Sequence, residues 1–529
     1  MRTVQRKTAI VLLAALLLVV TACSGNANDP DNAAGEDNGS ANQQGTNTVV
    51  NDDEGEPVTI RIMSTLGSAE VPEDDPQRAF VDVVEEALNV NLEFIAPPAS
   101  GYESQLQLTL ISGDLPDVVF FPSEDNEMYI NAVNDGVIVP INDYLEDADN
   151  LMAHSYEHSW SALKTMGDDN IYAIPRTSIT RNDGFTVRKD WMDNLGIPVP
   201  ENSEMSVEEF TDMLHRFTFD DPDGNGKDDT YGFGSFVDAN KILQPVLTSE
   251  LGHYGWQAYG GGEYDYTLPE YDRNSDVYAN VLGYTRDLYA SGVLDPDSPI
   301  NDNKTASERF ERGITGVVRD FAGYVKRKED ALHKLNPEAE LTYLFVQGPE
   351  GEVKGGVYGT GIWGVWAITS AAEHPEKAVE VFDYLLSDEG WDLVSYGMEG
   401  THYTMENGER VYSPEAGTMY MQRNIVRRHD DPDFFLHPTS YTEADKELVR
   451  PWIQKAVDTA VVSLDQGHTP AAAREPKFMD YKLTWDELTT RIMLGDLPME
   501  QLGPIRDDWY KHGGEAYMEQ MNDYIRSTQ

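Results

Sequence analysis

The chain of 529 residues is long enough for two or more domains of ordinary size, each with its own hydrophobic core. Lys and Arg total 39 against 93 Asp and Glu, which gives a formal net charge of −54 at pH 7. Such a field repels phosphate backbones, so the composition argues against nucleic acid as a partner. Because Cys23 is the single cysteine, no disulfide within the chain is possible.

Residues 1–22 have the three parts of a secretion signal. Basic residues within positions 2–7 are followed by the apolar run AIVLLAALLLVV and then by small residues directly before Cys23. The stretch Val20–Cys23 resembles the lipobox of a bacterial lipoprotein signal peptide, which implies cleavage before Cys23 and its lipidation with acyl chains such as palmitate. An uncleaved membrane helix is the alternative, but the apolar run is short for a span of about 20 residues.

Residues 23–57 are predicted to form a flexible tether. They are rich in Asn, Gly, Asp and Ser and nearly free of large apolar side chains. Such a segment cannot bury enough apolar surface to order itself. We therefore expect a folded body that moves freely above the membrane to which Cys23 anchors it.

Residues 58–121 alternate between strand and helix patterns. The runs VTIRIM (58–63), VNLEFI (90–95) and DVVFF (117–121) are typical of strands. Apolar residues at helical spacing precede the second run, and a helix is expected over 102–112. This β-α-β-α-β order predicts a parallel sheet covered on both faces, with ligands bound beyond the carboxyl ends of its strands.

Further helices are marked by their caps. Ser206 and Glu209 form a predicted capping box before an amphipathic helix. Another helix begins at Pro375, and Ser387 caps the one after it. From about residue 440 onward the pattern is mostly helical.

The stretch FDDPDGNGKDDTYGF, residues 219–233, contains a candidate calcium loop. Carboxylates and one carboxamide recur at alternate positions and a glycine allows a sharp turn, as in an EF-hand loop. The candidate ligands are Asp221, Asp223, Asn225, the carbonyl of Lys227, and Asp229. The twelfth position, where an EF-hand has a bidentate Glu, is Gly232. A solvated turn without a metal is the alternative.

Two other motifs do not support a site. Residues 359–364 match the glycine pattern of dinucleotide-binding proteins, but a strand rather than a helix is expected directly after them. His154 and His158 are four apart without a convincing third metal ligand, so surface histidines are the better interpretation.

Candidate ligand-binding residues are aromatic side chains and arginines. Flat aromatic faces stack on sugar rings, and polar side chains bind their hydroxyls. Trp363 and Trp366 are equally consistent with core packing, and for arginines in so acidic a chain salt bridges are the commoner role. The candidates are Trp256, Trp363, Trp366, Arg176, Arg188 and Arg319.

Four stretches, in this order, resemble one protein family. They are ISGDLPDVVFFPS, DDNIYAIPR, VRKDWMDNLGIPVPENSEMSVEEFTDML running into DPDGNGKDD, and GIWGVWAITSAAEHPEKAVEVFDYLLSDEGWDLVSYGMEGTHY. They are similar to the extracellular solute-binding proteins (family 1) of carbohydrate ABC transporters, and more narrowly to the LipO-like lipoproteins and their alginate-oligosaccharide-binding relatives. The resemblance spans roughly residues 58–529.

The resemblance implies an α/β, two-lobed periplasmic-binding-protein fold of type II, whose lobes are joined by interlobe crossings. By analogy, residues 58–175 and 318–368 form lobe 1, and residues 176–317 and 369–529 form lobe 2. In the alginate-binding relatives a bound calcium uses a Glu directly after the last Asp of its loop. Thr230 occupies that position here, so one ligand differs.

The predicted function is a lipid-anchored, extracytoplasmic and non-enzymatic oligosaccharide receptor of an ABC importer, monomeric and with a structural calcium ion. Its partners would be the sugar and the permease subunits. Alternatives are a surface glycoside hydrolase or lyase, which suggestive carboxylate pairs allow, and a peptide-binding or sensory lipoprotein.

Overall fold

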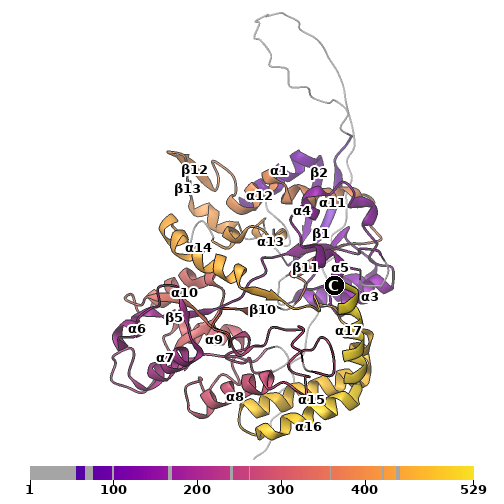
Figure 1. Ribbon diagram of the computed structural model, residues 1–529. Coiled ribbons are helices and arrows are strands. Elements are labelled where there is room, and N and C mark those ends of the chain that lie inside the picture. Colours follow the sequence, from indigo (N-terminus) through magenta and orange to yellow (C-terminus); the bar gives the residue numbers. More distant parts are fainter. Residues whose placement is uncertain are drawn as a thin grey trace, which may run out of the picture. The chain divides into compact units, whose positions relative to one another are not determined.

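The computed structural model describes residues 55–65, 76–97, 101–164, 169–238, 242–260, 262–357, 359–419, 422–436 and 441–528. All of them belong to one unit that begins at Gly55 (Figure 1). The predicted signal peptide, Cys23 and nearly all of the predicted tether lie outside the described residues. Within these ranges, every helix is too short or too polar to span a bilayer.

A first sheet has the strand order β2-β1-β3-β11-β4. Strand β1 pairs in parallel with β2 and β3, whereas β11 runs antiparallel to β3 and β4. The expected β-α-β-α-β order of the first three strands is therefore confirmed. The elements are β1 (Val58–Met63), α1 (Pro76–Leu88), β2 (Val90–Ile95), α2 (Tyr102–Ser112), β3 (Val118–Phe121), β4 (Ile174–Thr177) and β11 (Ile362–Ile368).

A second sheet has the order β6-β9-β5-β8-β7. The predicted capping box is confirmed, since Ser206 Oγ accepts a hydrogen bond from the Glu209 amide and the Glu209 carboxylate accepts one from the Ser206 amide. The elements are β5 (Phe185–Arg188), α6 (Lys189–Leu195), β6 (Glu204–Met205), α7 (Val207–Phe219), β7 (Tyr231–Phe233), α8 (Val277–Ala290), α9 (Asn303–Glu311), β8 (Thr315–Arg319), α10 (Val325–His333) and β9 (Leu341–Val346).

The remaining elements cover these sheets or connect them. Near the first sheet lie α3 (Glu127–Asn134), α4 (Asp149–Ala153), α5 (Glu157–Ala162), α11 (Pro375–Leu386), α12 (Asp388–Tyr396), β12 (Tyr403–Glu406), β13 (Glu409–Tyr412) and α13 (Gln422–Ile425). With the second sheet lie β10 (Gly355–Val357), α14 (Glu443–Asp458), β14 (Ala460–Val462), α15 (Pro476–Met493), α16 (Leu502–Trp509) and α17 (Glu515–Thr528).

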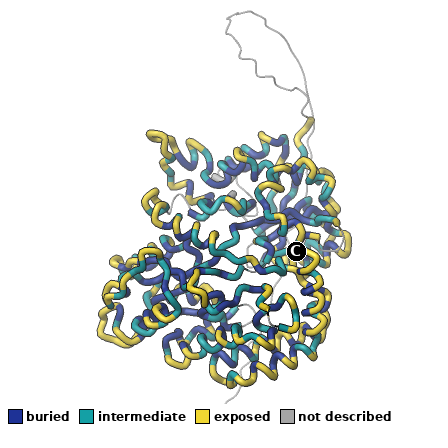
Figure 2. The backbone as a smooth tube through the Cα atoms, viewed as in Figure 1, coloured by how far each residue is buried: buried dark blue, intermediate teal, exposed yellow. Residues whose placement is uncertain are grey.

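Each sheet lies in a hydrophobic core of its own. We call residues 58–177 and 362–434 the first lobe, because their buried side chains form one cluster around the first sheet. We call residues 185–357 and 441–528 the second lobe, whose buried side chains form three neighbouring clusters. Figure 2 shows the strands of both sheets as buried segments and the exposed residues on the outer helices and turns.

The lobe boundaries differ from those expected. Residues 318–368 were expected in the first lobe, but β8 and β9 pair with β5 in the second sheet and β10 pairs with β14, so of this stretch β11 is the strand that lies in the first sheet. Helices α11 and α12 were expected in the second lobe, but they pack in the core of the first. The chain returns to the first lobe only after β10, because β8 and β9 both complete the second sheet around β5.

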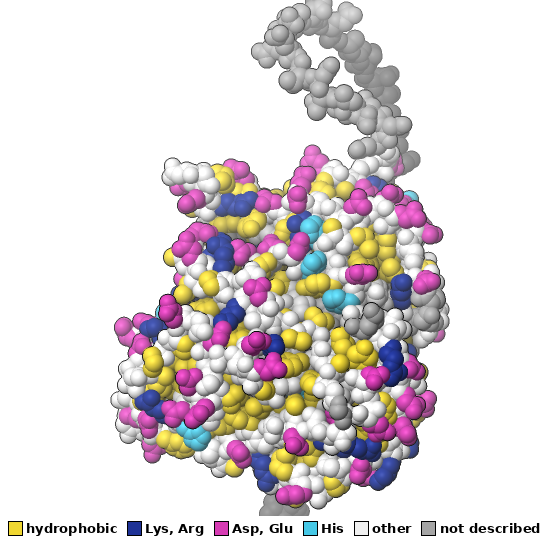
Figure 3. Space-filling view, in the orientation of Figure 1, with side chains coloured by type: hydrophobic (Ala, Val, Ile, Leu, Met, Phe, Trp, Pro, Cys, Tyr) yellow, Lys and Arg dark blue, Asp and Glu magenta, His cyan; other side chains and the backbone are white. Residues whose placement is uncertain are grey.

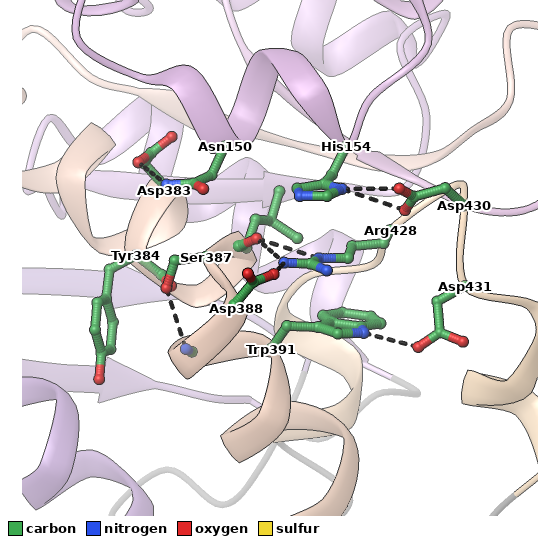
Figure 4. A network of polar contacts seen from close by, with 12 residues as sticks. Asn150, His154, Asp383, Tyr384, Ser387, Asp388, Trp391, Arg428, Asp430 and Asp431 are labelled. Atoms are coloured by element: carbon green, nitrogen blue, oxygen red, sulfur yellow. Dashed lines mark hydrogen bonds and ion pairs between the residues drawn. The ribbon is translucent and has the colours of Figure 1, made fainter.

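The last crossing also comes later than expected. Figure 4 shows that residues 428–431 are held on the first lobe by polar contacts. His154 Nδ1 lies 3.0 Å from the Asp430 carboxylate, and Trp391 Nε1 donates to Asp431 at 2.8 Å. The chain therefore leaves the first lobe near Phe435 and not near residue 370.

Acidic side chains are spread over the surface. On the face in Figure 3, Asp and Glu are scattered among neutral side chains, with Lys and Arg between them. Most of the ion pairs have at least one partner that is well exposed, and such pairs contribute little to stability. On this face the negative charge does not gather into one docking patch.

Candidate ligand-binding cavity

A cavity of about 580 Å³ opens where the two lobes meet. The first lobe contributes the loop after β3 and the start of β11, and the second lobe contributes the end of β8 and part of β10. The loop after β3, residues 122–126, is one of the strand ends where the sequence predicts ligand contacts. The residues that line the cavity include Ser123, Glu124, Asp125, Ile179, Thr180, Arg181, Asn182, Asp183, Thr248, Ser249, Arg319, Gly356, Val357, Thr360, Gly361, Ile362, Trp363 and Gly467.

Trp363 lies in the cavity because strand β11 is irregular there. Ile362 pairs with Thr177 and Val365 pairs with Pro175, so two residues of β11 oppose one residue of β4. Such a bulge turns a side chain out of the regular pleat. The Trp363 side chain is 52% exposed although the strand around it is buried.

Gly364 makes the bulge possible. Its φ of +107° lies in a region that side chains with a Cβ rarely adopt. A Cβ at this position would also lie 2.3 Å from Cζ of Phe120. The glycine therefore fixes the local path of β11 that presents Trp363 to the cavity.

Arg176 supports this bulge from β4. Its Nη1 donates to the Trp363 carbonyl at 2.7 Å, and its Nη2 donates to Asn424 Oδ1 at 3.3 Å. The side chain is buried and is not part of the cavity lining. The expectation of direct ligand binding by Arg176 is thus corrected: it holds the backbone of Trp363 in place.

Two other arginines line the cavity and are each matched by a carboxylate. Arg181 Nε donates to Asp183 Oδ1 at 2.9 Å, and its guanidinium lies 5.7 Å from the Trp363 ring. Arg319 Nη2 donates to Glu250 Oε1 at 2.8 Å. Burial raises the pKa of Asp183, and the charge of Arg181 opposes that shift. Arg319 was a sequence candidate, whereas Arg181 was missed because an Arg in a loop carries no distinctive pattern.

Glu124 is a third carboxylate in the cavity wall. The Thr360 hydroxyl donates a hydrogen bond to Glu124 Oε1, which joins the loop after β3 to the segment before β11. Burial raises the pKa of the Glu124 carboxyl, and the Thr360 hydrogen bond opposes that shift. The wall thus offers guanidinium donors and carboxylate acceptors beside one exposed aromatic ring, the combination that sugar hydroxyls and sugar C–H faces require.

Three candidates lie in cores and not in the cavity. Trp366 is buried among Phe120 and Phe382, and its Nε1 donates to the Ile425 carbonyl. Trp256 is 2% exposed and packs in the cluster of the C-terminal helices.

Arg188 is 2% exposed and pairs with Asp190 over the ring of Trp191. These three expectations are corrected, because packing and ion pairing already use the side chains. We do not propose them as ligand contacts.

The candidate calcium loop, residues 221–229, is an exposed turn after α7. Asp221 has a φ of +49° and one buried carboxylate oxygen without a hydrogen-bond partner. Asn225 Nδ2 donates to Asp223 at 2.7 Å and to Asp229 at 3.1 Å. Burial raises the pKa of Asp223, and the nearby carboxylates of Asp221 and Asp229 add to that shift. Two carboxylates thus converge on one side-chain amide.

Thr230 does not join this group. It is buried, and its Oγ1 donates to the Phe217 carbonyl at 2.9 Å, so it holds the loop against α7. In the part of the chain that the structure describes, no set of three or more His, Cys, Asp or Glu is arranged to hold a metal ion. The donor set would therefore have to come from carboxylates together with the Asn225 carboxamide and backbone carbonyls.

The sequence is similar to known proteins over most of its length. A profile of the family described as bacterial extracellular solute-binding protein matches residues 73–390. The chain is 23% identical over 480 residues to the polygalacturonan/rhamnogalacturonan-binding protein YtcQ of Bacillus subtilis (strain 168). The aligned region covers 86% of this chain and 89% of YtcQ. It is 25% identical over 494 residues to the lipoprotein LipO of the same strain, and this aligned region covers 89% of this chain and 93% of LipO.

Solved structures share the fold. The alginate-binding protein AlgQ2 without calcium ion has a TM-score of 0.61 at 17% identity, covering 89% of this chain and 98% of its own. The Streptococcus pneumoniae substrate-binding protein FusA in complex with kestose has a TM-score of 0.63 at 17% identity, covering 89% and 99%. A FusA EF-hand mutant with fructo-nystose has a TM-score of 0.62 at 16% identity, covering 89% and 99%. This likeness confirms the predicted two-lobed α/β solute-binding fold.

Proposed function

The chain belongs to the family of bacterial extracellular solute-binding proteins, and from this premise we propose that it is the oligosaccharide-binding receptor of an ABC importer. The cavity between the lobes, with Trp363 exposed in it, is the observation that carries the proposal. The relatives YtcQ and FusA are named for carbohydrate ligands, which supports the same class here.

In this proposal the ligand is bound and released without chemical change. Trp363 stacks on a sugar ring while Arg181, Arg319 and Glu124 exchange hydrogen bonds with its hydroxyls. Residues between β4 and β5, and between β10 and β11, connect the lobes, and rotation about such connections closes a cleft on its ligand. The closed, monomeric protein then delivers the sugar to the permease subunits.

The same proposal includes a lipid anchor at Cys23 on the outer side of the cell membrane. The lipobox-like stretch and the similarity to a lipoprotein support it. Replacing Cys23 with Ser is expected to release the full chain from membranes into the medium of the producing cells. Release would be measured by fractionation, and mass spectrometry of the native chain should find acyl groups on Cys23. An unmodified Cys23 would contradict the anchor.

The test of ligand class is a binding screen of the purified chain. Isothermal titration and melting shifts are measured with neutral and uronic-acid oligosaccharides, and with short peptides as a comparison. Specific binding raises the melting temperature by linkage. We expect oligosaccharide binding with intact sugar recovered afterwards. Binding of peptides alone would overturn the proposed ligand class, and cleavage of the sugar would favour an enzyme.

We further propose that residues 221–229 hold a structural calcium ion. The partnerless buried oxygen of Asp221 and the carboxylates of Asp223 and Asp229, which both accept from Asn225 Nδ2, support a cation there. Calcium prefers six to eight oxygen ligands, and the Lys227 carbonyl and a carboxylate such as Asp228 are available nearby. The ion would pull together like charges that now repel and would hold the loop after α7.

Calcium binding is tested by titration with calcium chloride and by melting with and without a chelator. The native chain should lose melting temperature on chelation, and Asp223→Ala should abolish both calcium binding and that loss. Asp287→Ala, an exposed change on α8 of the same lobe, is the matched control and should behave like the native chain. If Asp223→Ala lost as much melting temperature on chelation as the native chain, the result would contradict this proposal.

A further inference from the structure

A second and larger cavity adjoins the first. Its volume is about 910 Å³, against about 580 Å³ for the cavity at Trp363. Glu124, Asp125 and Gly467 line both cavities. The two spaces therefore meet at the loop after β3 and at Gly467.

The second cavity has one wall on each lobe. On the first lobe, four residues of α3 at helical spacing form a stripe along it: Glu127, Ile130, Asn131 and Asn134. Opposite lie residues 466–474, Met479 of α15 and Tyr524 of α17. Figure 1 shows α17 reaching toward α3, in agreement with this lining.

The chemistry of this cavity suits a carbohydrate. The rings of His468 and Tyr524 stack face to face, with their centroids 3.8 Å apart and an angle of 8° between their planes, so each ring keeps one outer face as a flat platform on which a sugar ring can stack. Burial lowers the pKa of His468, and the charge of Arg474 adds to that shift, which favours the neutral imidazole. The carboxamides of Asn131, Asn134 and Gln466 supply donors and acceptors for hydroxyl groups.

Gly467 packs closely against Thr360 at the junction between the cavities. Gly467 has a φ of +76°, and a Cβ there would lie 2.6 Å from Cγ2 of Thr360. Thr360 is the residue whose hydroxyl donates to Glu124. A side chain at position 467 would displace Thr360, so the glycine and the Glu124–Thr360 pair together shape this junction.

We propose that the second cavity is a continuation of the sugar site, so that one oligosaccharide chain runs from Trp363 past Glu124 and Gly467 to the His468–Tyr524 platform. The receptor then selects its ligand by length. Short sugars use only the first cavity, whereas longer chains also gain contacts in the second. This inference rests on the proposed function, since it extends the same site.

The test is affinity as a function of chain length. Size-graded galacturonide, fructo- and alginate oligosaccharides of two to six units are titrated into the full chain. In the series that binds, affinity should rise with length. Ala471→Trp, which fills the second cavity from an exposed position, should weaken the longest oligomer about tenfold and leave the shortest unchanged.

Tyr524→Ala, which removes one of the two stacked rings, should show the same length-dependent loss. The control is Ala153→Trp, an equal change at an exposed site of α4 that lines neither cavity. Equal affinity for all lengths, with no effect of Ala471→Trp on the longest, would overturn this inference and leave the proposed function standing. Absence of binding for every oligosaccharide would overturn both.

Discussion

Strand β11 has two halves with different roles. At its start Trp363 is 52% exposed in the cavity, and three residues later Trp366 is 1% exposed in the core of the first lobe. Both are tryptophans on the same strand, and both contact the first lobe. The backbone carbonyl of Trp363 accepts from Arg176, and the ring of Trp366 packs on Phe120. What separates them is the bulge at Gly364, which ends the regular pairing with β4.

The difference shows how this fold makes a binding residue. A regular strand covered on both faces buries each of its side chains, as in the half that contains Trp366. The bulge frees one side chain, and Arg176 binds the backbone carbonyl beside it. The core half of β11 therefore contributes stability and the irregular half contributes recognition.

The largest expected effect is on stability, and it separates the two tryptophans. Trp366→Ala should lower the free energy of unfolding by about 3–5 kcal/mol, because it leaves a cavity in a packed core. Trp363→Ala should change it by less than about 0.5 kcal/mol, since the side chain is largely exposed. Urea unfolding of both variants and of the native chain measures these differences in the free energy of unfolding. Similar losses for both would show that Trp363 belongs to the core.

The bulge itself is tested at Gly364. Gly364→Ala should cost about 1–3 kcal/mol, because the added Cβ meets the Phe120 ring and the backbone angle is unfavourable. Oligosaccharide affinity should fall as well, since the path that presents Trp363 is disturbed. Gly408→Ala, in the exposed turn between β12 and β13, also has a positive φ but meets no atom within 4 Å, so it separates backbone strain from the clash. A Gly364→Ala chain as stable as the native one would mean that the bulge does not need glycine.

Arg176 is expected to act on binding through Trp363. Arg176→Met removes the hydrogen bond to the Trp363 carbonyl and should weaken oligosaccharide binding about five- to tenfold. Arg176→Lys retains a donor and should restore part of the affinity, which a purely structural role would not predict. Isothermal titration of both variants with the oligosaccharide measures these two affinities. Equal loss in the Met and Lys variants would contradict the positioning role.

The smallest expected effect concerns pH at the cavity. Burial raises the folded-state pKa of Glu124 above its unfolded value of about 4.3, so ionisation opposes folding. This penalty is absent below about pH 4 and grows as pH rises through the raised pKa. Glu124→Gln should therefore have the native melting temperature near pH 4 and a higher one at pH 7. The corresponding gain in the free energy of unfolding at pH 7 should be less than about 1 kcal/mol.

The matched control for that effect is Glu86→Gln, an exposed change in the middle of α1. Its melting temperature should follow the native chain at every pH. A Glu124→Gln variant that is less stable than the native chain at pH 7 would reverse the sign and show that the Thr360 hydrogen bond outweighs burial.

Local patterns in the sequence predicted the local structure well. The first three strands and the capping box at Ser206 depend on residues close in sequence, and the structure confirms them. The lobe boundaries were wrong because they depend on strand pairing between distant segments, such as β5 with β9.

The candidate site shows the same limit. Trp363 and Arg319 were named from the sequence, but Arg181 became visible only when the fold brought it over the Trp363 ring. No periodicity distinguishes an exposed Trp363 from a buried Trp366, because the deciding feature is a one-residue shift in register against β4.

The most direct test of the account is oligosaccharide affinity of Trp363→Ala measured by isothermal titration, beside the native chain and the conservative variant Trp363→Phe. We expect a loss of at least about tenfold in affinity for Ala, a smaller loss for Phe, and an unchanged melting temperature of the ligand-free protein. Native affinity in the Ala variant would contradict the claim that the cavity at Trp363 is the sugar-binding site.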